Sequence, residues 1–348
     1  MDPRIDYLEF AIRHFGSAEY DLASSGAPAV QSSELGYEAA DEPEARQRFL
    51  WAIAGRYQVP LEVMLPTLGA SGALYTVCKA LLRPGVAVAV ETPSYEPLWR
   101  VPEGLGARVS RFSRAGSVEE ALAQIDGAAK LVILSNPHNP TGHQLDDDAL
   151  LELACALGPE RYLLVDEVYR ELARPVSTCF REKTNIITIN SVTKCLGVPW
   201  ARAGWICAPL ELVPSLRRVE LHTVGNAPPS CFAWGAAAVE QSAWLLERVA
   251  KLQRGKRQLI DAWLGERAEQ LEVEPGFDDS LFLWVRDRRG RDLLPLIEAG
   301  IASHGVVVSP GSFFGAADCF RVSFTLSEER LAAGLARLDA TLELAPQA

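Results

Sequence analysis

Short apolar runs alternate with stretches of helical period along the middle of the chain. The runs at residues 86–91, 130–136, 161–167 and 185–191 are apolar along most of their length, and each ends in polar residues. Strands that are apolar on both faces are typical of a parallel sheet covered by helices on both sides. The pattern therefore predicts an α/β fold with a mostly parallel central sheet flanked by helices.

Two of the intervening stretches have an amphipathic helical pattern. Residues 71–82 place Leu74 and Val77 on one apolar face, and a Pro-Gly pair follows as a stop signal. Residues 146–157 form a second such stretch, with aspartates in the first turn, where the helix dipole favours negative charge. Since ligands of open α/β sheets gather at the carboxyl ends of the strands, the polar ends of the apolar runs are candidate site positions.

The last third of the chain has a different pattern. Residues 228–270 are rich in Ala, Leu, Glu and Arg and predict one or two long helices. Strand-like runs follow at 281–287, 305–310 and 319–325, and a closing helix is expected from Glu328. This order predicts a smaller α+β domain.

The domain division expected from these patterns has two parts. Residues 45–250 form the large α/β domain, whereas residues 1–44 and 251–348 form the small domain with an N-terminal segment. The first forty residues have weak periodicity, so they are expected to pack against the small domain or to wrap onto a neighbouring subunit.

Composition narrows the class of protein. The 348 residues are 48% hydrophobic and 23% charged, which is typical of a soluble globular protein. A net charge of −11 disfavours a nucleic-acid partner, and no apolar run approaches the roughly 18 residues of a membrane helix. Seven cysteines without a CxxC pair suggest neither a disulfide framework nor a metal site, and no signal peptide is apparent, so a cytoplasmic location is expected.

Polar residues follow the predicted strands in an order that packing does not explain. The segments are Asn136-Pro137-His138-Asn139-Pro140-Thr141-Gly142, Asp166-Glu167-Val168-Tyr169 and Ser191-Val192-Thr193-Lys194, with Arg202 eight residues after the lysine. In these motifs the sequence resembles the class I and II aminotransferases, which are aspartate aminotransferase-like enzymes of fold type I. The resemblance covers nearly the whole chain and implies a pyridoxal 5′-phosphate cofactor.

Lys194 is the central residue of this resemblance. Taken alone, a lysine after a buried strand is usually a solvated loop cation. A Schiff-base lysine needs a setting that destabilises its ammonium form, and a strand end beside Arg202 supplies one. The resemblance implies that Lys194 holds the cofactor as a Schiff base and then moves the substrate proton as general base and acid.

The resemblance assigns roles around the cofactor ring. Asp166 pairs with the pyridine nitrogen and keeps the ring protonated, although a lone aspartate at this position is often only a turn former. Tyr169 and Asn139 share the phenolic oxygen of the ring. Tyr95 stacks on the ring face.

A second set of residues is assigned to the cofactor phosphate. The helix beginning near residue 70 has small residues at its start, where free N–H groups and the dipole suit one phosphate group. By resemblance Ala70 and Ser71 supply these groups. Ser191, Thr193 and Arg202 complete the phosphate site.

Three further residues are assigned to the substrate and to a neighbouring subunit. Arg321 lies inside a strand-like run and by resemblance clamps the substrate α-carboxylate with a bidentate guanidinium. Gly26 resembles a glycine whose backbone approaches the same carboxylate, which Asn139 also serves. Tyr37 corresponds to a tyrosine that reaches the phosphate of the partner's cofactor, which implies a homodimer.

The implied function is transfer of an amino group between an amino acid and a 2-oxo acid, in amino acid metabolism or biosynthesis. A lyase or decarboxylase of the same fold is the main alternative, because the motifs fix the cofactor and not which bond is broken. A non-catalytic regulator is a further alternative, although such proteins carry an added basic DNA-binding domain and only about forty residues precede the large-domain pattern here. No arginine that would select a dicarboxylate side chain is evident near residues 222–229, so the substrate stays undefined.

Overall fold

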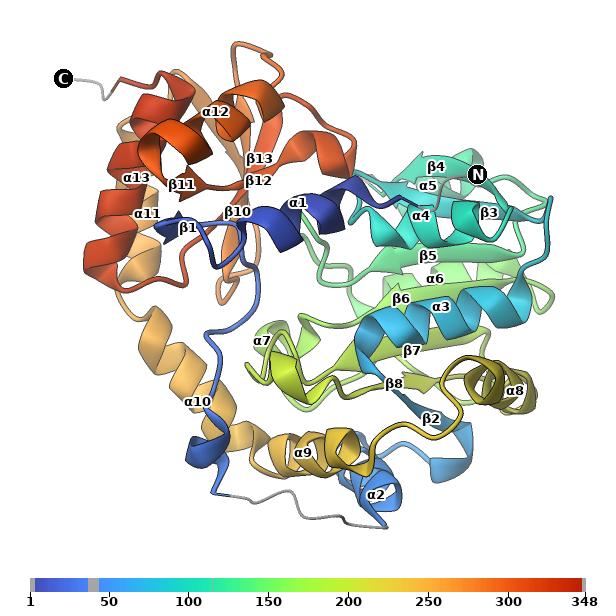
Figure 1. Ribbon diagram of the computed structural model, residues 1–348. Coiled ribbons are helices and arrows are strands. Elements are labelled where there is room, and N and C mark those ends of the chain that lie inside the picture. The colour runs from blue at the N-terminus through green and yellow to red at the C-terminus, as the bar shows by residue number, and fades with distance from the viewer. Residues whose placement is uncertain (1–3, 37–43, 115, 346–348) are drawn as a thin grey trace.

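The computed structural model describes residues 4–36, 44–114 and 116–345 (Figure 1). Its centre is a seven-stranded sheet in the order β2-β8-β7-β6-β5-β3-β4. The strands are β2 (Met64–Thr67), β3 (Ala87–Thr92), β4 (Arg108–Ser113), β5 (Leu131–Ser135), β6 (Tyr162–Asp166), β7 (Ile186–Ser191) and β8 (Gly204–Cys207). Pairs among β3 to β7 are parallel, and β8 runs antiparallel to both of its neighbours.

Helices cover both faces of this sheet (Figure 1). Alternate side chains of each strand point to opposite faces, so Leu131 and Ile133 lie in one core and Val132 and Leu134 in the other. The first core is closed by α3 (Gly69–Leu81), α4 (Pro97–Gly104) and α8 (Val213–Thr223), and the second by α5 (Val118–Gln124) and α6 (Asp147–Leu157). The α/β prediction is confirmed, and the helix expected at 71–82 is α3.

A third apolar cluster lies beside β2 and β8. It packs α2 (Ala45–Tyr57) against α9 (Pro229–Glu240), with Phe49 and Phe232 stacked at a ring-centroid distance of 5.8 Å. After α9 the chain continues through α10 (Ser242–Gln253) and α11 (Lys256–Gly265), so residues 228–270 are helical as predicted but form three helices, not one or two.

The C-terminal part forms a second body with its own core (Figure 1). A four-stranded antiparallel sheet has the order β12-β13-β10-β9, and α12 (Leu294–His304) and α13 (Glu328–Leu342) pack beside it. The strands are β9 (Leu271–Glu274), β10 (Phe282–Asp287), β12 (Ser309–Pro310) and β13 (Cys319–Ser323). The predicted run at 305–310 divides into β11 (Val306–Val307) and β12.

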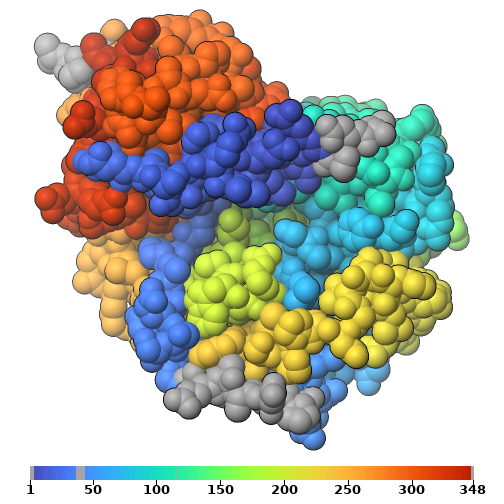
Figure 2. All heavy atoms as spheres, viewed as in Figure 1, coloured from blue at the N-terminus to red at the C-terminus, as the bar shows by residue number. Residues whose placement is uncertain are grey.

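The N-terminal segment joins this second body. The short strand β1 (Tyr20–Asp21) pairs in parallel with β11, and Phe10 of α1 (Asp6–His14) is buried in the same core. Figure 2 shows this segment running across the surface between the C-terminal part and the large sheet. Residues 6–22 therefore pack against the C-terminal part, as one of the two expected placements has it, whereas Val30 and Leu35 further along the segment pack in the cluster of α2 and α9. Within the described ranges, none of the helices combines the length and apolar character needed to cross a bilayer.

Candidate active site

A cavity of about 270 Å³ lies at the carboxyl edge of the central sheet. Its wall includes Ser135, Asp166 and Ser191, which are the last residues of β5, β6 and β7. Parallel strands end at the same edge, and this edge is where open α/β sheets bind their ligands. The start of α3 and the N-terminal segment close the cavity from other sides.

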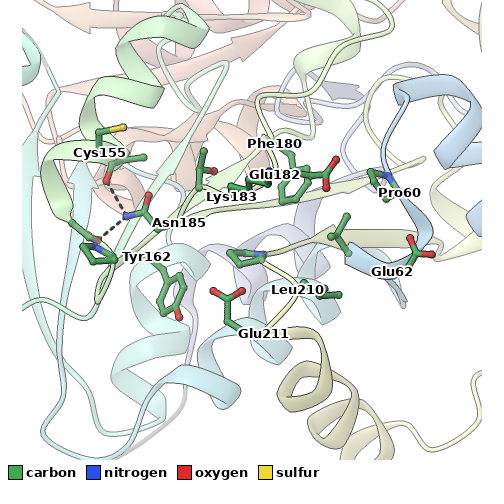
Figure 3. Close-up of a pocket in the computed structure, with 16 residues that line it drawn as sticks. Pro60, Glu62, Cys155, Tyr162, Phe180, Glu182, Lys183, Asn185, Leu210 and Glu211 are labelled. Atoms are coloured by element: carbon green, nitrogen blue, oxygen red, sulfur yellow. Dashed lines mark hydrogen bonds between the residues drawn. The ribbon is translucent and has the colours of Figure 1, made fainter.

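A larger groove of about 750 Å³ lies at the opposite edge (Figure 3). It runs past Tyr162 and Asn185, which stand at the amino ends of β6 and β7. None of the predicted site residues within the described ranges lines it. The larger groove is therefore not the candidate site, and the smaller cavity is the candidate because the predicted residues line it.

Ten of the thirteen predicted site residues line the smaller cavity. They are Ala70, Ser71, Tyr95, Asn139, Asp166, Tyr169, Ser191, Thr193, Lys194 and Arg202. Arg321 is fully buried behind the wall and bonded to Asn139, and Gly26 lies against Lys194. Tyr37 lies outside the described residues.

Lys194 is held in a setting that favours its neutral amine. Burial, followed by the positive charge of Arg321, lowers the pKa of Lys194 to about 8, although Asp166 acts in the opposite direction. Its Nζ atom lies 3.4 Å from the Ser25 hydroxyl oxygen. A lysine with such a pKa is partly neutral near pH 7 and can act as a nucleophile or a base.

Asp166 is a buried carboxylate that lacks a full set of partners. Burial raises the pKa of Asp166 to about 7, and the opposing influences are the Val168 N–H at 3.1 Å and the charge of Lys194. Within the described part of the chain, Val168 is the one hydrogen-bond donor to this carboxylate. A buried carboxylate of this kind favours a cationic or N–H partner entering from the cavity.

The other end of the cavity suits a phosphate group. Arg202 points its guanidinium at the start of α3, and no carboxylate of the described residues pairs with it. Helix α3 has no side-chain cap, so its first N–H groups are free to bind an anion. The hydroxyl-bearing residues Ser71, Ser191 and Thr193 line the same cavity.

Gly69 is required where α3 approaches Arg202. Its φ is +72°, and a Cβ atom there would lie 3.0 Å from Arg202 Nη2. We expect Gly69→Ala to displace the guanidinium and to weaken binding of pyridoxal phosphate about tenfold. A fluorescence titration of the apoprotein measures this constant.

The matched control for this prediction is Gly72→Ala in the same helix. A Cβ atom at Gly72 would make ordinary contacts at 3.7 and 3.9 Å, so the binding constant is expected to stay within about twofold of that of the wild type. Equal losses in the two variants would contradict the role of Gly69.

Arg321 is fully buried and bonded to neutral acceptors. Its Nη1 donates to Asn139 Oδ1 at 2.6 Å, while Nη2 is within hydrogen-bond distance of the Tyr7 hydroxyl and the Ala23 carbonyl, both at 3.0 Å. No described carboxylate forms an ion pair with it, and its Nε has no partner. An uncompensated buried guanidinium is a ready site for a carboxylate ligand.

Asn139 and Tyr169 are oriented by neighbouring groups. Because the Asn139 oxygen accepts from Arg321, its amide N–H₂ group, which has no acceptor among the described residues, is left to donate into the cavity. The hydroxyls of Tyr169 and Ser25 lie 2.6 Å apart, and burial raises the pKa of Tyr169, which keeps it a neutral donor.

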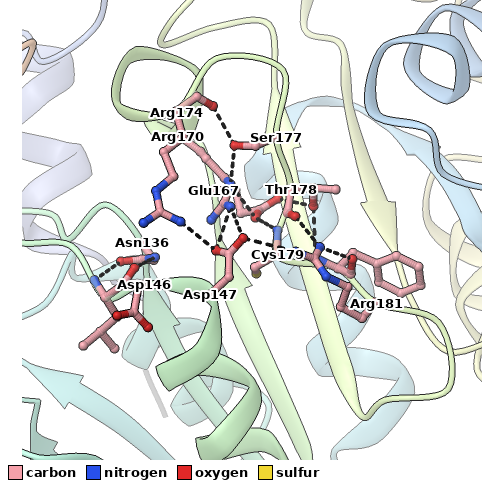
Figure 4. A network of polar contacts seen from close by, with 12 residues as sticks. Asn136, Asp146, Asp147, Glu167, Arg170, Arg174, Ser177, Thr178, Cys179 and Arg181 are labelled. Atoms are coloured by element: carbon pink, nitrogen blue, oxygen red, sulfur yellow. Dashed lines mark hydrogen bonds and ion pairs between the residues drawn. The ribbon is translucent and has the colours of Figure 1, made fainter.

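Two buried polar networks hold the loops that carry these residues. Figure 4 shows the first, in which Asp147 accepts from Arg170 at 2.7 Å and Arg170 lies 3.4 Å from Glu167. This network fixes the segment between Asp166 and Tyr169 against α6. In buried networks each lost partner is costly, so these contacts give the segment one conformation.

The second network holds the loop of Asn139. Glu91 is fully buried and accepts from the Ser135 N–H at 2.6 Å, the Ser135 hydroxyl at 2.8 Å and Arg114 at 3.1 Å. The Ser135 oxygen in turn accepts from the Asn139 N–H at 3.1 Å. His138 is buried beside Glu91, and burial lowers its pKa to about 4, so it is neutral near pH 7.

Several cavity residues were missed by sequence reasoning. They include Tyr7, Leu8, Ser25, Ser135 and Val168. Ser25 precedes Gly26, and Ser135 lies at the end of a predicted strand. Their closeness in sequence to residues with assigned roles was the signal that could have found them. Tyr7 and Leu8 had none, because they belong to no motif and reach the cavity through the tertiary packing of α1.

The cavity fits pyridoxal 5′-phosphate on the residues present. It has an amine of lowered pKa, a buried acid lacking donors, and an unpaired guanidinium with free helix N–H groups at the opposite end. These suit an aldehyde, a ring nitrogen and a phosphate. No group of three or more His, Cys, Asp or Glu in the described ranges is placed to hold a metal ion.

Two curated proteins are similar to this chain over most of its length. Capreomycidine synthase of Streptomyces vinaceus is 28% identical over 85% of this chain and 79% of its own length. An arginine–pyruvate transaminase of Pseudomonas aeruginosa is 30% identical over 78% of this chain and 73% of its own length. The chain thus spans most of each relative.

Solved structures show the same fold. A PLP-dependent aminotransferase of Streptococcus suis has a TM-score of 0.82 with 24% identity, covering 99% of this chain and 98% of that one. A PLP-dependent cyclase has a TM-score of 0.83 with 23% identity, covering 98% and 97%. The family model "Aminotransferase class I and II" matches residues 31–338. The chain therefore belongs to the class I and II aminotransferase family.

Proposed function

We propose that this pyridoxal phosphate-dependent aminotransferase uses Lys194 as the residue that binds the cofactor covalently and moves the substrate proton. The observation that carries the proposal is the buried Lys194 amine, with its pKa lowered to about 8, in one cavity with Asp166 and Arg202. The neutral amine can attack an aldehyde, and once released it can take a proton from the substrate Cα.

The remaining side chains bind and orient. Bound pyridoxal phosphate supplies an electron sink for the carbanion that forms when the Cα–H bond breaks. Asp166 would hold the proton of the ring nitrogen, Asn139 and Tyr169 would donate to the phenolic oxygen, and Tyr95 would pack on the ring. Arg202 would bind the phosphate together with Ala70, Ser71, Ser191 and Thr193.

Arg321 is proposed to bind the substrate α-carboxylate. Its neutral acceptors orient it without neutralising its charge, so an incoming carboxylate gains an ion pair in a water-poor setting. Gly26 lies beside this site, against the Lys194 stem, where a Cβ atom would meet Lys194 Cδ at 3.6 Å. Its backbone is proposed to approach the same carboxylate.

The pH dependence of cofactor capture tests the state of Lys194. The neutral fraction of an amine increases until the pH passes its pKa, so the rate of covalent capture by the apoprotein is expected to level off above about pH 8. Stopped-flow absorbance measures this rate. A rate that still climbs through about pH 10, as an ordinary lysine would give, would contradict the lowered pKa.

Half-reactions with purified holoprotein test transamination itself. Across a panel of amino acids, the expected result is loss of the bound-cofactor absorbance with equimolar pyridoxamine phosphate and 2-oxo acid. Release of carbon dioxide or ammonia without pyridoxamine phosphate would favour a lyase or decarboxylase.

A second candidate is an intramolecular cyclisation that uses the same cofactor site. It is favoured by the similarity to capreomycidine synthase and to a PLP-dependent cyclase, each over most of the chain. A cyclase would consume an amino acid that carries a leaving group on its β-carbon and a nucleophilic group further along its side chain. The leaving group would depart together with the Cα proton, the nucleophile would then bond to the β-carbon, and a cyclic amino acid would be returned with no 2-oxo acid. Mass spectrometry of the products separates the two candidates.

The proposed assembly is a cytoplasmic homodimer in amino acid metabolism or biosynthesis. Large apolar side chains are exposed on α2, α3 and α8, including Trp51 at 55% and Leu221 at 56%. Tyr37 is proposed to serve the phosphate of the neighbouring cofactor. The proposed large domain is residues 45–250, and residues 1–44 with 251–348 form the small one.

Sedimentation at the concentration of the activity assay tests this assembly. We expect a dimer, and Trp51→Glu is expected to shift the mass toward the monomer with loss of activity. A fully active monomer of the wild type would contradict the dimer and the role of Tyr37.

A further inference from the structure

We propose that Tyr7 is a further substrate-binding residue, whose hydroxyl donates a hydrogen bond to the α-carboxylate held by Arg321. This inference rests on the proposed role of Arg321 and adds a second, uncharged ligand to it. No motif pointed to Tyr7. Its place in the structure, at the cavity wall and against Arg321, carries the inference.

The hydroxyl of Tyr7 already accepts a hydrogen bond but can still donate one. Its oxygen accepts from Arg321 Nη2 at 3.0 Å, whereas its proton has no acceptor among the described residues. A phenol can accept and donate at the same time. The open O–H therefore stands beside an uncompensated cation, and a carboxylate fits both groups.

Tyr7 is held rigidly in this position. Its ring, which is 5% exposed, meets those of Tyr95 and Phe314 edge to face at centroid distances of 5.3 and 5.5 Å. Its backbone N–H donates to the buried carboxylate of Glu96 at 2.5 Å, at the first turn of α1. A donor fixed before binding loses little entropy when the ligand arrives.

The conservative variant isolates the hydroxyl. Tyr7→Phe keeps the ring packing, and Arg321 Nη2 keeps two acceptors for its two N–H groups, the Ala23 carbonyl at 3.0 Å and the Ser309 hydroxyl at 3.1 Å. The guanidinium therefore stays in place. What the variant loses is the O–H group of a residue that lines the cavity.

Two carbonyl reagents test the inference without knowledge of the natural substrate. Aminooxyacetate carries a carboxylate and methoxyamine does not, and both consume the absorbance of the bound cofactor. The wild-type holoprotein is expected to react faster with aminooxyacetate. Tyr7→Phe is expected to lose about tenfold in that rate alone, with the methoxyamine rate within about twofold. Tyr20→Phe, a tyrosine of the same segment that does not line the cavity, is the matched control.

The outcomes separate this inference from the proposed function. If Tyr7→Phe changes neither rate, or lowers both equally, Tyr7 is a packing residue and the inference is wrong while the role of Arg321 stands. If the wild-type protein does not react faster with aminooxyacetate than with methoxyamine, Arg321 does not bind a carboxylate. The proposed roles of Arg321 and of Tyr7 are then both wrong.

Discussion

Replacement of Lys194 by alanine is expected to abolish covalent attachment of the cofactor and to lower kcat by roughly 10⁴-fold or more, because one amine serves as nucleophile and as base. The absorbance of the imine between lysine and cofactor, which borohydride reduces in the wild type, should be absent. Noncovalent binding of pyridoxal phosphate should persist, since the phosphate site around Arg202 is untouched.

Two further variants test whether the effect is due to the amine of Lys194. Lys194→Arg keeps a positive charge but has no amine that can form an imine, so it should be as inactive as the alanine variant. Lys183→Ala removes an exposed lysine far from the cavity and should leave kcat unchanged. Covalent cofactor in Lys194→Ala would refute the assignment.

Asp166→Asn is expected to lower kcat by roughly 10³-fold, or about 4 kcal/mol, because the neutral amide no longer keeps the ring nitrogen protonated. A cofactor analogue with a permanently positive ring nitrogen should restore much of the lost rate. Asp146→Asn is the matched control, because Asp146 caps α6 and asparagine is an equally good cap. A kcat of Asp166→Asn within tenfold of the wild type would contradict the role of Asp166.

The same variant should make the apoprotein more stable. Since burial raises the pKa of Asp166 to about 7, the native state binds more protons than the unfolded state between about pH 4 and pH 7. The contribution of Asp166 to stability therefore falls as the pH rises through this window. Asp166→Asn removes that loss, so denaturant unfolding at pH 8 should show a higher free energy of unfolding than for the wild-type apoprotein.

Local sequence pattern was sufficient for four strands of the central sheet and for most of the cavity, whereas β2, β4 and β8 were not predicted. The runs that became β3, β5, β6 and β7 are apolar on both faces, and their polar ends meet because parallel strands finish at one edge. The direction of β8 could not be predicted, since its fully buried pattern is the same as that of a parallel strand. Strand direction depends on connectivity and not on burial.

Contacts between residues that are far apart in the sequence could not be predicted from local pattern. Tyr7 meets Arg321 across 314 positions, and no local pattern in α1 indicates that contact. The pairing of Asp147 with Arg170 likewise depends on α6 lying against the loop after β6. Charged residues in a sequence read as solvated until their buried partners are known.

The central claim is that the chain holds its cofactor through the amine of Lys194. Borohydride reduction of the holoprotein, proteolysis and mass spectrometry test it most directly. The expected result is a single pyridoxyl phosphate adduct on the peptide that contains Lys194. An adduct on another lysine, or no adduct in protein that carries the cofactor, would contradict the account.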